Sequence, residues 1–82
     1  MEFLRLRNDA PSDARIAHNV SSAVRDRIGR KGELLEISAD KGLVTLRGVV
    51  TSFYEKQLSL HVAKRVSGVS GLRDELVVSY YD

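Results

Sequence analysis

The stretch that decides the fold runs from residue 35 to residue 50 and reads LEISADKGLVTLRGVV. Apolar and polar residues alternate on both sides of Asp40-Lys41-Gly42, which is the period-two pattern of strands with one buried face. The glycine lies where a short hairpin loop needs a positive φ. The stretch therefore predicts a β-hairpin with one apolar face. That face consists of Leu35, Ile37, Ala39, Val44, Leu46, Gly48 and Val50.

A helix is expected before the hairpin, from about residue 13 to residue 28. Ser12 or Asp13 can cap its start, and Gly29 and Gly32 end it. Its apolar residues recur at steps of three and four, which places them on one helical face. They are Ile16, Val20, Ala23, Val24 and Ile28.

A second helix is expected directly after the hairpin. Ser52 and Glu55 have the spacing of a capping box, and Ser67-Gly68 ends the helix. One side carries Leu58, Ser59, Val62, Ala63 and Val66, of which Ser59 and Ala63 are small enough for close approach to a sheet. Residues 72–80 then alternate again and predict a third strand.

The expected order is αββαβ, an α+β two-layer sandwich with a three-stranded mixed sheet and both helices on one face. The third strand follows a crossover helix, so it should run parallel to the strand before that helix. Turn-forming residues 8–13 separate a flexible tail, residues 1–11, from one domain, residues 12–82.

Composition narrows the classes of function. The chain has 82 residues and no cysteine, which excludes disulfides and thiolate metal sites. A core of this size leaves no room for a deep active site, so we expect neither an enzyme nor a small-molecule substrate. His18 and His61 lack a second ligand at the i+4 spacing, so we expect no metal and no cofactor. No signal peptide core is visible, which keeps a cytoplasmic location open.

The cations are unevenly distributed. Residues 15–31 hold five cations and one acid, a net charge of +4, which leaves −2 for the rest of the chain. These cations could meet anionic head groups, or they could complement the dipole of the first helix. The helical and strand patterns do not require Val49, Phe53 and Leu60 in the core. The predicted contact residues are therefore Arg25, Arg27, Arg30, Lys31, Phe53 and Leu60.

The ordered glycines and apolar residues resemble the BON domain, named for bacterial osmotically inducible and nodulation proteins. The resemblance rests on residues 42–50 with the pattern G-x-V-x-L-x-G-x-V, and on residues 63–69 with the pattern A-x-x-V-x-G-V. It covers roughly residues 12 to 79, and its structural positions include Gly42, Gly48, Ser52, Gly68 and Val69. Asp74 departs from the family, which often has Asn at that position.

The resemblance implies a small non-enzymatic module of the kind found in osmotic-shock proteins, secretins and outer-membrane lipoproteins. Its implied partners are anionic phospholipid or an envelope protein, and its implied location is the periplasm or cell envelope. By this interpretation, basic and exposed apolar side chains together support peripheral membrane association.

Two alternatives remain open from the sequence. Gly29-Arg30-Lys31-Gly32 has the composition of the phosphate-clamping G-x-x-G loop of KH nucleic-acid-binding domains, which would require a helix over residues 33–39. The other alternative is a protein-interaction module in which an exposed sheet edge pairs with another copy, giving weak self-association.

Overall fold

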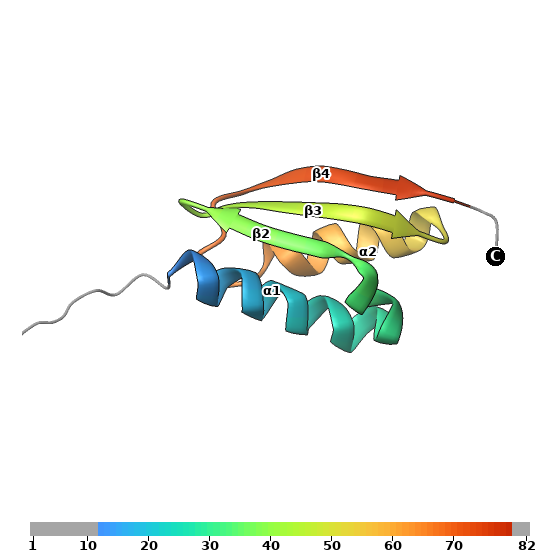
Figure 1. The fold of residues 1–82 in the computed structure, drawn as a ribbon, viewed down its shortest axis with the longest axis horizontal. Helices are drawn as coiled ribbons and strands as arrows, with labels where there is room; N and C mark the ends of the chain where they lie inside the picture. Colours follow the sequence, from blue (N-terminus) through green and yellow to red (C-terminus); the bar gives the residue numbers. More distant parts are fainter. Residues whose placement is uncertain (1–11, 80–82) are drawn as a thin grey trace, which may run out of the picture.

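The computed structural model describes residues 12–79, with only the backbone described for residues 31–33. The elements are α1 (Asp13–Ile28), the 3₁₀ helix η1 (Gly29–Leu34), β2 (Glu36–Asp40), β3 (Leu43–Val50), α2 (Phe53–Lys64) and β4 (Gly71–Val78). Both helices lie on one face of the sheet (Figure 1). The predicted α+β sandwich with αββαβ order is confirmed. The predicted tail, residues 1–11, lies outside the described residues.

The sheet has the order β2-β3-β4, so β3 is its central strand. β2 pairs with β3 antiparallel, with Ala39 opposite Val44. β3 pairs with β4 parallel, with Leu46 opposite Asp74. The parallel direction of β4 follows from the crossover through α2, as the sequence predicts.

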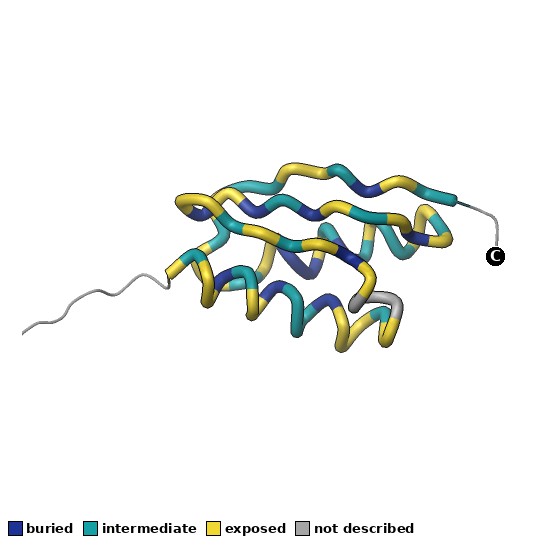
Figure 2. Tube along the Cα trace, viewed as in Figure 1, coloured by how far each residue is buried: buried dark blue, intermediate teal, exposed yellow. Residues whose placement is uncertain are grey.

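The core lies between the sheet and the two helices. Val20, Val24, Val44 and Leu46 are fully buried, and Figure 2 shows that the buried positions of α1 lie on its side toward the sheet. Ala63 and Ser59 are also fully buried on α2. Their small side chains allow α2 to lie close to the sheet, as expected from the sequence.

The helix starts are capped as the sequence predicts. Ser12 Oγ accepts from Arg15 N at 3.2 Å, and Ser52 Oγ accepts from Glu55 N at 3.1 Å. Glu55 reaches back to Thr51, whose N and Oγ1 donate to Glu55 Oε1 at 3.0 Å and 2.8 Å. The bonds to Ser12 and Ser52 satisfy donors that the first turn of each helix leaves open, whereas the bonds to Glu55 hold the residue before the cap of α2.

The chain after α1 differs in detail from the expected turn. Gly29 ends α1 with φ 73°, but the chain then forms η1 before β2 begins at Glu36. Leu35 lies between η1 and β2 and is 8% exposed, so it still belongs to the core.

Asp13 joins the start of α1 to the hairpin loop. Its carboxylate accepts from Lys41 N at 2.8 Å and from Gly42 N at 3.1 Å. Lys41 and Gly42 both have positive φ, 53° and 86°, and in this conformation both amides of the loop donate to the residue at the helix start. A single carboxylate therefore fixes the loop against the helix layer.

Replacing Asp13 tests this connection. Asp13→Ala should lower the free energy of unfolding by about 2 kcal/mol, because two loop amides lose a charged acceptor. Asp26→Ala is the matched control: Asp26 is an exposed acid in the same helix, and its loss should change stability by less than about 0.5 kcal/mol. Urea unfolding followed by circular dichroism measures both. Equal effects of the two substitutions would contradict the role given to Asp13.

Candidate functional site

Exposed large apolar side chains gather at one end of the molecule. Each is between 57% and 76% exposed, and we call the end of the molecule that carries them the apolar end: Leu34, Val49, Phe53, Tyr54 and Val77. Leu43, which is 38% exposed, lies beside the hairpin loop at the opposite end. An exposed group of this kind is typical of a contact surface.

The topology brings these residues together. β3 and β4 both end at the apolar end, and α2 starts there, as Figure 1 shows. η1 also lies there, because the backbone of Leu34 and Leu35 packs against Gly48 of β3. Residues from four separate segments are thus placed at one end.

The predicted cations lie where α1 ends. Arg25 and Arg27 occupy the last turn of α1, Arg30 lies in η1, and all three are exposed. The side chain of Lys31 lies outside the described residues. Since α1 ends beside η1, the cations and the apolar end lie at the same side of the molecule (Figure 1).

The two apolar residues predicted for contact have different surroundings. Phe53 is 58% exposed in the first turn of α2. Leu60 is partly buried and packs against the core, so we do not include it in the apolar end. Leu34, Tyr54 and Val77 were not among the contact residues predicted from the sequence. Val77 could have been identified from the alternating pattern of its strand, because it falls on the side opposite to the buried Leu76.

A shallow groove runs between the helices. Its floor contains Ala23, Val62 and Val66, and Arg27, His61 and Arg65 also line it, around a volume of about 400 Å³. No acid lines this groove. Arg27 and Arg65 make the rim of the groove positive, so positive charge extends from the end of α1 onto α2.

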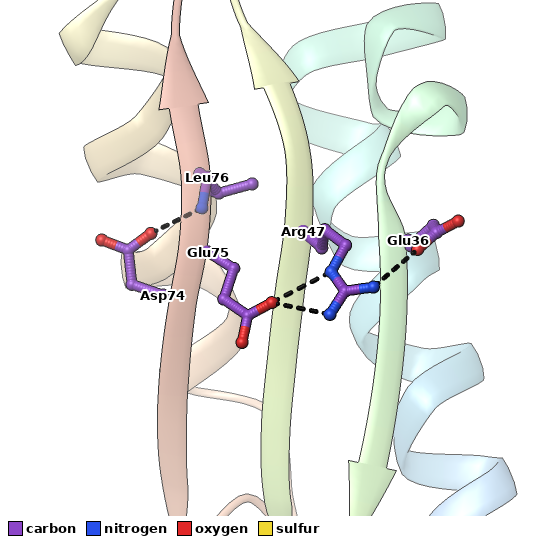
Figure 3. Close-up of polar contacts among 5 residues, drawn as sticks. All are labelled: Glu36, Arg47, Asp74, Glu75 and Leu76. Atoms are coloured by element: carbon purple, nitrogen blue, oxygen red, sulfur yellow. Dashed lines mark hydrogen bonds and ion pairs between the residues drawn. The ribbon is translucent and has the colours of Figure 1, made fainter.

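The face of the sheet that the helices leave open carries a charged row. Arg47 lies between Glu36 and Glu75, as Figure 3 shows. Its Nε and Nη2 each lie 2.9 Å from Glu75 Oε1, and its Nη1 lies 3.9 Å from Glu36 Oε1. The row keeps the middle of this face hydrated while Val49 and Val77 make its end apolar.

The positions of the glycine pattern have structural roles. Gly42 completes the hairpin loop, and its N–H donates to Asp13. Gly68 has φ 97° in the turn after α2, and Val69 packs against the core. Ser52 caps α2. None of these residues carries an exposed reactive group.

The KH-like alternative required a helix over residues 33–39. Glu36–Asp40 instead form β2, paired with β3 along its whole length. That alternative is therefore wrong, and the Gly29–Gly32 segment belongs to the turn between α1 and β2.

None of the helices within residues 12–79 has the length and hydropathy that a transmembrane span requires. The same residues contain no group of three or more histidine, aspartate or glutamate side chains placed to hold a metal ion.

The fold and the site define a small α+β module with an exposed contact end. Residues 12–80 match the model of the BON domain, and the chain belongs to the BON domain family. No curated protein matches the chain. The family assignment confirms the resemblance found in the sequence.

Gly48 provides a test of how η1 is positioned. A Cβ at Gly48 would lie 2.8 Å from Leu35 Cδ2 and 3.3 Å from the Leu34 carbonyl oxygen, at a φ of 145°. Gly48→Ala should lower the free energy of unfolding by about 3 kcal/mol through strain and overlap.

Gly29→Ala is the matched control, because Gly29 also has a positive φ but its Cβ would meet no atom within 4 Å. It should cost less, about 2 kcal/mol, which is the strain of a side chain at φ 73° and ψ −148° without any overlap. Thermal unfolding of both variants decides the comparison. If Gly29→Ala costs as much as Gly48→Ala, the close approach of η1 has no role in stability.

Proposed function

We propose that this BON domain is a non-catalytic binding module that associates peripherally with anionic phospholipid membranes through its apolar end. The observation that carries the proposal is the placement of five exposed apolar side chains at the same end of the molecule as the cations that end α1. BON domains are known as binding modules, and a bacterial envelope location is part of the proposal on the basis of the family.

The physical chemistry of the surface supports reversible membrane association. Each basic residue near an anionic surface contributes about 1 kcal/mol, and this attraction weakens as salt increases. Phe53 and Tyr54 are adjacent in the first turn of α2 and can enter the interfacial region of the bilayer without unfolding the helix. A few cations and two aromatic rings give weak binding, which suits a module that works beside other membrane attachments.

The charged part of the surface can be tested with vesicles. Arg27→Glu combined with Arg30→Glu should reduce co-sedimentation with phosphatidylglycerol vesicles by about tenfold or more, since two attractive charges become repulsive. The matched control combines Arg15→Glu with Lys64→Glu, which makes the same charge change at the end of the helix layer beside the hairpin loop. The control should retain most of the binding.

The apolar part needs its own variant. Phe53→Ser combined with Tyr54→Ser should weaken vesicle binding by about tenfold, because less apolar surface is buried in the interface. Equal binding of the unmodified chain to phosphatidylglycerol and phosphatidylcholine vesicles would exclude the electrostatic proposal. No binding to either would leave the apolar end as a surface for an envelope protein.

A further inference from the structure

Strand β4 has one side without a partner strand. It lies at the end of the order β2-β3-β4, and over residues 12–79 only β3 pairs with it. β4 has eight residues, whereas β2 at the other edge has five. A long unpaired edge offers its backbone donors and acceptors to any added strand.

The register shows which backbone groups face outward. Along a strand, the N–H and C=O of successive residues point to opposite sides. Val50 pairs with Val78 in the parallel ladder, and Ser79 N, just beyond β4, donates to Val50 O at 2.8 Å. Within β4 the odd-numbered residues therefore face β3, whereas the bond from Ser70 N to Gly42 O lies before the strand begins. The even-numbered residues, which include Asp74 and Leu76, therefore present their N–H and C=O at the open edge.

One of these outward groups already has a partner from its own strand. Leu76 N donates to Asp74 Oδ1 at 3.0 Å. Figure 3 shows the Asp74 carboxylate beside the edge of β4 that points away from β3. The carboxylate therefore occupies the position in which the carbonyl oxygen of an added strand would accept this hydrogen bond.

A lysine of α2 holds the carboxylate in place. Lys56 Nζ lies 3.3 Å from Asp74 Oδ2, and the side chains of Lys56 and Asp74 are only 23% and 36% exposed. One carboxylate oxygen thus binds the strand backbone while the other binds the helix. Asp74 also lies on the side of β4 that faces the helices. If another strand were added, that side would be buried, and burying a charge there disfavours the addition.

We propose that the β4 edge is a strand-pairing surface for the β4 edge of a second copy of this chain, and that Asp74 keeps it closed. Two β4 edges are self-complementary, because an antiparallel two-fold pairing sets the outward groups of one copy opposite those of the other. Any such pairing that covers most of β4 includes Leu76. The hydrogen bond from Leu76 N to Asp74 must therefore break before the two copies can pair. The closed form is the one that the structure shows.

The test compares the self-association of Asp74 variants in the absence of lipid, so its result is independent of the proposed membrane function. The chain should be monomeric by sedimentation velocity, and Asp74→Ala should dimerise with an association constant at least about tenfold larger. Asp74→Asn keeps an acceptor for Leu76 N but loses the ion pair, so its association should lie between the two. Lys56→Met should have a smaller effect than Asp74→Ala.

Asp74→Pro is the matched control for the route of association. It also removes the carboxylate, but proline lacks the N–H that Asp74 presents at the edge and blocks an added strand. Asp74→Pro should therefore remain monomeric. Equal association of the Ala and Pro variants would show that the copies meet elsewhere and would overturn the proposal.

Amide exchange at Leu76 keeps the proposal testable if the proline variant does not fold. In Asp74→Ala, protection of this amide should increase with protein concentration, because the second copy takes over the hydrogen bond. Overturning results would be an Asp74→Ala variant that remains monomeric, or one that dimerises without protecting Leu76.

Discussion

The structure depends on burying the alternate residues of β3 beneath two helices. Val44 and Leu46 are fully buried and Val50 nearly so, while their neighbours on the same strand point to the open face of the sheet. A chain of this length can complete only one core, so only one face of the sheet is covered. The other face has to remain compatible with water. Arg47, held between Glu36 and Glu75, meets that requirement in the middle of the open face.

Local patterns in the sequence predicted most of the fold. Period-two alternation identified the hairpin, and the caps at Ser12 and Ser52 identified both helix starts. The 3₁₀ helix η1 was missed because a short turn between two glycines has no periodicity to detect. The contact of Asp13 with the hairpin loop was missed for a different reason. It joins residues 28 and 29 positions apart, and its formation depends on how the helix layer lies against the sheet.

The candidate site was only partly visible in the sequence. Clustering of charge was enough to select the arginines that end α1, because those residues are close in sequence. The apolar end could not be assembled in the same way, since Leu34, Tyr54 and Val77 come from segments that meet only when the directions of β3, β4 and α2 are known. Leu60 shows the opposite case. Its surroundings are set by packing against the core, which helical periodicity alone did not assign.

The two exposed surfaces differ in what can recognise them. At the apolar end, contact is made by side chains, so their shape and charge can favour one partner over another. At the β4 edge, contact would be made by backbone donors and acceptors that every extended chain possesses, so affinity comes without selectivity. A protein can leave the first kind of surface open, but the second has to be closed unless the correct partner is present. The Asp74 carboxylate, bound to Leu76 N and held by Lys56, lies at the backbone edge, where recognition would otherwise be least selective.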